Sequence, residues 1–233
     1  MNRTVKWGLG VVVSFACIAG LGVGYLYAAF PKVGPAKDLH VEKTAEAVQR
    51  GAYLAGHVTA CLDCHSTRNW KRYSAPPIPE TLGAGGEHFS REQGFPGDFY
   101  SKNITPAAIG SWTDGEIARA FTTGVSRDGH AMFPVMPYLD YGHLCTRDVN
   151  AIVAYLRSLT PIPHEVRTGK LDFPMNLIVR TIPAPAEPWE CPKAGTPDYG
   201  RYLTNAAACK ECHTQQDHGK PRTGMEFAGG WVF

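Results

Sequence analysis

Four of the seven cysteines in this chain stand in two copies of one five-residue pattern, Cys-x-x-Cys-His. The first copy supplies Cys61, Cys64 and His65, and the second supplies Cys209, Cys212 and His213. Thiol and imidazole groups at this spacing serve three kinds of chemistry. They form a thiol redox couple, contribute half of a zinc site, or anchor a haem group covalently.

The histidine and the distance between the two copies favour haem attachment. A redox pair needs no adjacent histidine, and a zinc site built from two such pairs wants them about 15–20 residues apart. These copies lie 148 positions apart. In haem attachment, the two thiols bond to the haem vinyl groups and the following imidazole becomes the proximal iron ligand. The sequence therefore predicts two covalently attached haem c groups, with His65 and His213 as their proximal ligands.

A methionine in a proline-containing loop is the predicted distal ligand of the first haem. Pro134 and Pro137 exclude a continuous helix here, so Met136 is expected on a rigid extended loop between two helices. Ligation by Met and His raises the reduction potential of the iron and leaves no open coordination position. Met132 is the alternative ligand. Met136 could also have no role in ligation and simply fill a gap in the core, as methionines do in many proteins.

Three helical patterns surround these ligands. Residues 44–55 have the pattern of a helix, in which Gly51 would let another helix cross closely. Residues 113–124 begin with a Thr-x-x-Glu capping box and end at a glycine. Residues 146–160 place apolar side chains at helical spacing up to a proline. Because strand signals are absent, we predict an all-α domain over residues 42–162.

The second motif belongs to an internal repeat. Residues 50–65 align with residues 199–213, with a glycine and a tyrosine at matching positions ahead of each motif. A distal ligand equivalent to Met136 would fall near position 284, beyond Phe233. We therefore expect residues 195–233 to be the start of an incomplete second domain, in a piece of a longer dihaem protein.

The alternative is that this short second domain is complete. Met225 is the one methionine after His213, and a reach of 12 residues leaves little chain to cover the far face of a haem. The second iron would then be five-coordinate or bound by a histidine such as His218. A haem without protein on one side exposes a large apolar surface, which soluble domains avoid unless a partner covers it.

The N-terminal segment predicts a membrane anchor. Two positively charged residues precede an uncharged stretch of 24 residues that begins at Trp7, long enough to span a hydrocarbon core of about 30 Å. Tyr25 and Tyr27 lie at the opposite end from Trp7, as interfacial aromatics tend to do. Because positive residues lie only on the N-terminal side of this stretch, we expect the rest of the chain to be exported. A cleaved signal peptide is the alternative, with a weak cleavage site at residues 27–29. We assign residues 1–41 to the anchor and a short linker.

Residues 163–194 are predicted to form an extended connector. The stretch 161–197 holds eight of the 18 prolines, which is typical of a semi-rigid linker. Cys145 and Cys191 belong to neither motif. In an exported protein they form either a disulfide that fastens the connector to the first domain or two separate free thiols.

Composition adds little to these predictions. The 233 residues are 44% hydrophobic and 19% charged, as expected for a globular protein. The net charge is +2 and no run of Lys or Arg occurs, so nothing points to nucleic acid as a partner.

The order of several motifs is similar to that of a known family. Residues 45–162 contain, in order, "CLDCH", "YSKNITP", "WTDGE", "FTTGVSRDGHAMFPVMPY" and "VNAIVAYLRSL". This order resembles the membrane-bound multihaem cytochrome c subunits of periplasmic alcohol, aldehyde and gluconate dehydrogenases. From about residue 195 the chain continues with "CKECH" and "GMEFAGG", and the latter resembles "TLGAGGEHF" in the first unit. The chain departs from the family pattern in having two haem motifs, where many members have three, and in its short second unit.

The resemblance implies a cytochrome c fold in which the methionine of "MPY", here Met136, is the distal ligand. It also implies a non-catalytic electron carrier of a bacterial inner membrane, with haem domains in the periplasm. The expected donor is a dehydrogenase, and the expected acceptor is the quinone or terminal oxidase side of the respiratory chain. One alternative is a haem enzyme or sensor, peroxidase-like or gas-binding, with an open position at the second haem. Another is a haem-bearing subunit that only anchors a partner enzyme.

Overall fold

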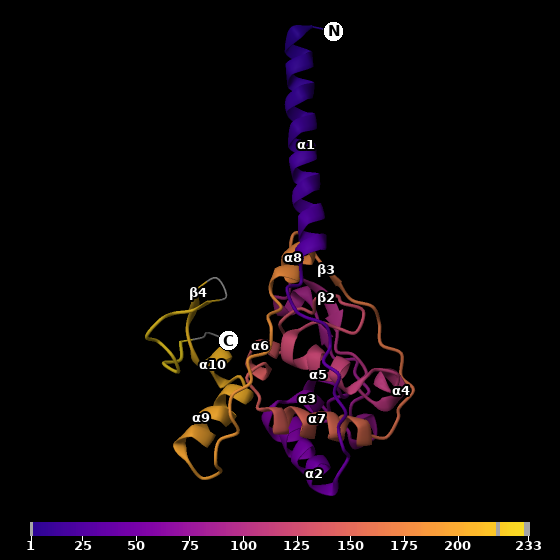
Figure 1. Ribbon diagram of the computed structural model, residues 1–233, viewed down its shortest axis with the longest axis vertical. Helices are drawn as coiled ribbons and strands as arrows, with labels where there is room; N and C mark the ends of the chain where they lie inside the picture. The colour runs from indigo at the N-terminus through magenta and orange to yellow at the C-terminus, as the bar shows by residue number, and fades with distance from the viewer. Residues whose placement is uncertain (1, 218–219, 231–233) are drawn as a thin grey trace.

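A long N-terminal helix stands apart from the rest of the molecule (Figure 1). The computed structural model describes residues 2–217 and 220–230. Helix α1 (Arg3–Ala29) has no buried residue, and the mean hydropathy of its most apolar window is 2.1. A helix of this length extends about 40 Å, more than the hydrocarbon core of a bilayer. Within the described residues it is the one helix long and apolar enough to cross a membrane, a test that a signal sequence also passes.

The remaining elements are short and gather in the body at one end of α1 (Figure 1). The α-helices are α2 (Ala45–Tyr53), α3 (Cys61–Cys64), α4 (Pro106–Ile109), α5 (Asp114–Thr123), α6 (Tyr138–Tyr141), α7 (Thr146–Ser158), α8 (Met175–Ile178), α9 (Pro197–Ala206) and α10 (Cys209–His213). A π-helical turn, η1 (Leu54–Val58), extends α2, and the 3-10 turns are η2 (Pro79–Thr81), η3 (Arg91–Gln93) and η4 (Val179–Thr181). The strands are β1 (His88–Phe89), β2 (Gly97–Tyr100), β3 (Lys170–Leu171), β4 (Gln216–Asp217) and β5 (Lys220–Pro221).

The strands form two small antiparallel sheets that the sequence did not predict. The first sheet has the order β1-β2-β3, with His88 opposite Tyr100 and Gly97 opposite Leu171, and β4 pairs with β5. Strands of two to four residues are too short to show the alternation of apolar and polar residues that identifies a strand in a sequence. The prediction of a helical fold is therefore confirmed for the core, whereas the expected absence of strands is wrong.

Helices α2 and α7 cross in close contact at Gly51. A Cβ atom at this position would lie 1.9 Å from the carbonyl oxygen of Ala151, so a larger residue would force the helices apart. The prediction that this glycine permits a close helix crossing is confirmed. The buried apolar cluster around the crossing includes Leu54, Val58, Ile109, Ile117, Phe121, Tyr141, Leu144, Ile152, Val153 and Leu156.

Helix α5 begins and ends where its sequence predicts. The hydroxyl of Thr113 accepts a hydrogen bond from the N–H of Glu116 at 3.1 Å, and the Glu116 carboxylate accepts one from the N–H of Thr113 at 2.8 Å. Gly124 ends the helix with a φ of 77°, and a Cβ there would lie 2.5 Å from the ring of Tyr138. Gly124 therefore lets the loop that carries Met136 and Tyr138 pack against the end of α5.

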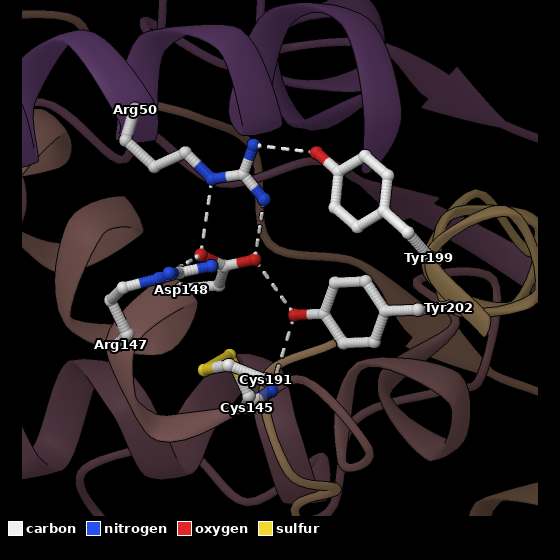
Figure 2. The surroundings of a disulfide bond; sticks show 7 residues. All are labelled: Arg50, Cys145, Arg147, Asp148, Cys191, Tyr199 and Tyr202. Atoms are coloured by element: carbon white, nitrogen blue, oxygen red, sulfur yellow. Dashed lines mark hydrogen bonds and ion pairs between the residues drawn. A yellow bond between two sulfur atoms is a disulfide. The ribbon is translucent and has the colours of Figure 1, made fainter. Parts of the chain in front are cut away.

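A disulfide joins Cys145, directly before α7, to Cys191 in the predicted connector (Figure 2). Of the two possibilities that the sequence left open, the structure contains the bridge. Cys145 is 1% exposed, so this end of the bridge is anchored in the core of the first unit. The bridge therefore fastens the connector to that core a few residues before α9 begins.

Helix α9 is held against the first unit by a polar network (Figure 2). Arg50 of α2 donates to the hydroxyl of Tyr199 at 3.0 Å. Tyr202, which is 2% exposed, donates to the carboxylate of Asp148 at 2.9 Å and accepts from the N–H of Cys145 at 3.2 Å. Since Asp148 lies in α7, the helix that precedes the second motif is fixed to both α2 and α7.

The predicted connector, residues 163–194, lies against other parts of the chain and contains elements of its own. Its strand β3 completes the first sheet, and Asp172 accepts hydrogen bonds from the guanidinium of Arg91 at 2.6 and 2.7 Å. Arg180 donates to the carbonyl oxygen of Phe30, directly after α1, at 2.8 Å. The segment is therefore less extended than expected, and it links the end of α1 to the first unit.

Candidate haem-attachment sites

The first motif follows a reversal of the chain at Ala60. The N–H and the hydroxyl of Thr59 both donate to the carbonyl oxygen of Leu54, at 2.8 and 3.0 Å, and end the π-helical turn. Ala60 then adopts a left-handed conformation with a φ of 49°. This conformation costs a residue other than glycine about 1–2 kcal/mol, and such strain is concentrated at functional sites. Helix α3 starts at Cys61, whose Sγ lies 3.2 Å from the Thr59 hydroxyl.

The imidazole of His65 is oriented by a backbone carbonyl. Its Nδ1 lies 2.6 Å from the carbonyl oxygen of Lys102, so the Nδ1–H tautomer donates there and Nε2 stays free. Burial lowers the pKa of His65, which favours the neutral imidazole that a metal ligand requires. The ring is therefore prepared to bind iron through Nε2.

The carbonyl of Lys102 is a functional group that the sequence analysis missed. Its loop is held by Asn103, whose amide donates to the carbonyl of Ile162 at 2.8 Å. The side-chain oxygen of Asn103 accepts hydrogen bonds from the N–H and hydroxyl of Thr105 at 2.9 and 2.8 Å. The short motif "YSKNITP" contributed only to the family resemblance, and nothing in it indicated a contact with a histidine 37 positions away.

The cysteines of the first motif do not have the properties of a thiol redox couple. Cys61 and Cys64 do not form a disulfide. Burial is the largest influence on both, and it raises the pKa of Cys64 and that of Cys61, the latter to about 11. Redox-active pairs instead contain a thiol whose pKa is lowered by positive charge or a helix N-terminus. Neutral, half-buried thiols beside an oriented imidazole agree better with covalent attachment of a cofactor.

Met136 lies in the loop between α5 and α6, half-buried against the core cluster. Its carbonyl accepts a hydrogen bond from the N–H of Tyr138 at 2.7 Å, and the Tyr138 hydroxyl donates to the carbonyl of Met132 at 3.1 Å. Tyr141 of α6 donates to the carbonyl of Thr59, two residues before the first motif. These bonds join the methionine loop to the motif. Met136 stays the predicted distal ligand, and Met132 of the same loop stays its alternative.

The second motif reproduces the chain reversal of the first. Ala208 has a φ of 50° and a ψ of 32°, and Ala60 has a φ of 49° and a ψ of 26°. Each alanine directly precedes the helical turn that contains the two cysteines. The same strained conformation at the same place shows that the backbone enters both motifs in the same way.

The glycine-rich segments that follow the motifs also correspond. The N–H of Gly85 donates to the carbonyl of His65 at 2.8 Å, and the N–H of Gly229 donates to the carbonyl of His213 at 2.8 Å. The φ angles of these glycines are 74° and 71°. The similarity between "TLGAGGEHF" and "GMEFAGG" therefore reflects one local structure built twice.

A third matching bond lies directly after each histidine. The hydroxyl of Ser66 accepts from the N–H of Gly83 at 3.1 Å, and the hydroxyl of Thr214 accepts from the N–H of Phe227 at 3.0 Å. Ser66 and Thr214 are both fully buried. The repeat thus extends from the helix before each motif to the glycine-rich segment after it.

The surroundings of the two histidines differ. The side chain of His213 is exposed, whereas that of His65 is half-buried. Met225 is half-buried in the segment before Gly229, and His218 lies outside the described residues. Over residues 2–217 and 220–230, no group of three or more His, Cys, Asp or Glu side chains is placed to hold a metal ion, so the two cysteine pairs do not converge on one site.

The donors at the first motif fit haem c. Two thiols, an imidazole with a free Nε2 and an apolar cluster occur together. A thioether lies in the loop directly before α6, and Tyr141 of α6 bonds to the same segment. With a mainly helical fold and the duplicated motif, these features define a c-type cytochrome.

Comparison with known proteins agrees with this class. No family model matches the chain. A nicotinate dehydrogenase subunit of Pseudomonas putida is 32% identical over 75% of the chain, and the cytochrome c subunit of the quinone-type alcohol dehydrogenase of Komagataeibacter europaeus is 29% identical over 78%. A diheme cytochrome c-type protein of Cereibacter sphaeroides is 29% identical over 97%. The matches span 14%, 39% and 72% of these three proteins. The relatives include cytochrome c subunits of dehydrogenases and a diheme cytochrome c, so the chain is similar to the family that its motifs indicated.

Proposed function

We propose that this chain is the membrane-anchored, dihaem part of a c-type cytochrome that carries electrons from a dehydrogenase to the respiratory chain. The observation that carries the proposal is the duplicated geometry of the two motifs. Both have the left-handed alanine and the hydrogen bond from a glycine to the histidine carbonyl. One motif could be a coincidence of sequence, whereas two motifs folded alike point to one cofactor held twice.

Seven residues would hold the two haem groups. Cys61 and Cys64 would form the thioether bonds of the first and Cys209 and Cys212 those of the second, with His65 and His213 as proximal ligands and Met136 as the distal ligand of the first. When bound, haem c supplies a one-electron Fe(III)/Fe(II) couple. The carbonyl of Lys102 keeps the proton of His65 on Nδ1. The buried cluster against which Met136 packs would line one side of the first haem.

The location of the chain follows from α1 and the disulfide. We infer that α1 crosses the bacterial inner membrane with its two N-terminal positive charges in the cytoplasm. The bridge between Cys145 and Cys191 supports a periplasmic body, because disulfides persist in oxidising compartments. In this arrangement residues 1–41 form the anchor and linker, residues 42–162 the first cytochrome c domain and residues 163–194 the connector.

Residues 195–233 would belong to a second cytochrome c domain. Gly200 corresponds to Gly51 in the repeat, where α7 crosses α2 in close contact. The position of a Cβ at Gly200 has no neighbour within 4 Å in the described structure. This open face of α9 is the place where a helix equivalent to α7 would pack.

The electron donor is proposed from the relatives. Their names include subunits of dehydrogenases for alcohol, fructose, gluconate and nicotinate. A dehydrogenase of this kind would reduce the cytochrome, and the quinone or terminal oxidase side would accept the electrons. Copurification of the chain with dehydrogenase activity from native membranes tests the donor directly.

The dihaem state is tested by intact mass under denaturing conditions. The chain is expected to carry two haem masses, and either double variant, Cys61→Ala with Cys64→Ala or Cys209→Ala with Cys212→Ala, is expected to carry one. Loss of all haem mass on acid–acetone extraction contradicts covalent attachment. Each double variant, once reduced, can then be exposed to carbon monoxide. For the second haem this test discriminates only in the protein at its natural length, where carbon monoxide binding would favour the open-site enzyme over the electron carrier.

A further inference from the structure

A segment beside the end of α1 is unusually poor in charge. Residues 173–186 read "FPMNLIVRTIPAPA", with Arg180 as the one charged residue, in a chain that is 19% charged overall. The segment contains α8 and η4. Phe173 is 79% exposed and Ile178 is 44% exposed, whereas Val179 between α8 and Arg180 is buried. Single exposed apolar residues are common, so the position of these two decides what they mean.

Arg180 ties this segment to the last turn of α1. Its guanidinium donates to the carbonyl oxygen of Phe30 at 2.8 Å and, more weakly at 3.4 Å, to those of Leu26 and Tyr27. It also lies 4.4 Å from the centre of the Tyr27 ring. The carbonyl end of a helix carries partial negative charge, so a guanidinium stabilises it. The segment is therefore held at the level where α1 ends, as Figure 1 shows for α8.

We propose that Phe173 and Ile178 insert into the surface of the same bilayer that α1 crosses. This inference rests on the proposed anchor, because a helix that ends at the bilayer surface places α8 there as well. An inserted phenylalanine removes much of its apolar area from water, which favours insertion. Tyr25 and Tyr27 lie in the last two turns of α1, a place that suits interfacial aromatics.

The charges around the patch agree with a lipid surface. No Asp or Glu occurs between residues 173 and 186, and Asp172 is paired with Arg91. Lys32 lies 5.1 Å from the centre of the Phe30 ring, close to the same helix end. Positive and neutral groups at this level suit anionic headgroups. The continuity of the patch with the anchor favours lipid over a protein as its occupant.

The consequence is a second contact between the body and the membrane. A single helix lets the attached body swing and rotate, whereas a helix plus an inserted loop restricts its orientation. Arg180 bonds the connector to the end of α1, and β3 of the connector pairs with the sheet of the first unit. A restricted segment would therefore also restrict the orientation of the first unit. The contact would thus fix which face of the first haem domain is presented to partners above the membrane.

Hydroxyl-radical footprinting of the complete chain in lipid nanodiscs tests the proposal. The nanodiscs contain phosphatidylethanolamine and phosphatidylglycerol, and X-ray radiolysis supplies the radicals so that no peroxide meets the haem. Phe227 is the matched control, because it is a phenylalanine, 55% exposed, in the C-terminal segment. By exposure alone Phe173 reacts faster than Phe227. If Phe173 is inserted in lipid, the order of the two rates inverts.

A third phenylalanine separates failure of this proposal from failure of the anchor. Phe15, in the middle of α1, is 75% exposed in the protein alone and is protected if α1 crosses the bilayer. Protection of Phe15 with rapid labelling of Phe173 overturns the inserted loop and leaves the anchor intact. Rapid labelling of Phe15 overturns the anchor, and the loop with it. If Phe173 is protected in native membranes but not in nanodiscs, a protein and not lipid contacts it.

Discussion

Arg50 and Asp148 form a two-point ion pair between α2 and α7. The Arg50 Nε donates to Asp148 Oδ1 at 3.1 Å, and Nη2 donates to Oδ2 at 2.7 Å. The Asp148 side chain is fully buried and that of Arg50 is 23% exposed. Each partner also bonds to a tyrosine of α9, Arg50 to Tyr199 and Asp148 to Tyr202 (Figure 2). The pair thus joins the two helices of the first unit to the helix that precedes the second motif.

The first prediction concerns the stability that this pair provides. Asp148→Asn keeps the shape but removes the charge, so Arg50 is left half-buried without its counter-ion. We expect the free energy of unfolding to fall by about 3 kcal/mol, the lower end for breaking a buried pair, since Arg50 retains some contact with water. Urea denaturation measures the change. The matched control is Asp172→Asn, whose partner Arg91 is half-exposed, and we expect it to cost much less, because water screens an exposed ion pair.

The second prediction is a dependence of stability on acid. Burial alone would raise the pKa of Asp148, but hydrogen bonds from Arg50 and Tyr202 and the charges of Arg50 and Arg147 lower it overall. A carboxyl whose folded pKa is depressed stabilises the protein above its unfolded pKa of about 3.9, and this stability is lost as the pH falls below that value. The wild-type protein should therefore lose stability more steeply below about pH 4 than Asp148→Asn does. Parallel slopes in the two proteins would show that Asp148 is not the group responsible.

The third prediction concerns the disulfide. The bridge between Cys145 and Cys191 closes a loop with a sequence separation of 46 residues. Chain entropy alone gives about 4 kcal/mol for a loop of this length. The double variant Cys145→Ala with Cys191→Ala should be destabilised to that extent, and hydrogen exchange of the amides in α9 should become faster. Helix α5 provides the internal control, since its exchange should change less. Unchanged exchange in α9 would mean that the tyrosine network holds this helix without the bridge.

Features that depend on residues close together in the sequence were predictable. The capping box of Thr113 and Glu116 and the helix stop at Gly124 follow from spacing alone, and the structure contains them. The crossing at Gly51 was predictable in kind, because a glycine inside a helical pattern implies a close approach. The haem motifs are local in the same sense, since each is complete within five residues.

Features that depend on the path of the folded chain were not predictable. The carbonyl of Lys102 faces His65 only because Asn103 fixes its loop to residues beyond α7. Tyr202 corresponds to Tyr53 in the repeat, yet Tyr53 is 42% exposed and Tyr202 is buried against Asp148. Repeat alignment predicts equal local structure, but the partner of each side chain depends on which surface it meets. The short strands were not predictable for the same reason. They form because distant segments of the backbone pair, and not because their sequences have a strand pattern.

The fourth prediction tests the distal ligand of the first haem. Met136→Ala should lower the midpoint potential by tenths of a volt, within the range of about 0.8 V that axial ligands span. It should also abolish the weak near-infrared band of Met-ligated Fe(III) haem. Met132→Ala is the control, and both properties should survive in it. If only Met132→Ala loses the band and lowers the potential, Met132 is the ligand. If the band survives in both variants, neither methionine is the sole ligand.

The last prediction compares the two glycines that correspond in the repeat. In Gly51→Ala the new Cβ meets the carbonyl of Ala151, so α2 and α7 must separate, and we expect a loss of about 2 kcal/mol in the free energy of unfolding. In Gly200→Ala the new Cβ meets nothing within 4 Å, and alanine is favoured over glycine in a helix by about 1 kcal/mol. The same substitution should thus destabilise at one position and stabilise slightly at the other. Urea denaturation of both variants measures the contrast.

The contrast also tests whether a longer protein completes the second domain. In such a protein, a helix equivalent to α7 would cross α9 at Gly200 and leave no room for a Cβ. Gly200→Ala should then stabilise the 233-residue chain but destabilise the longer protein by an amount similar to that of Gly51→Ala, about 2 kcal/mol. Hydrogen exchange should locate the loss in α9 and not in α2. A longer protein that tolerates Gly200→Ala would show that no helix packs on this face, and the second unit would then not be built like the first.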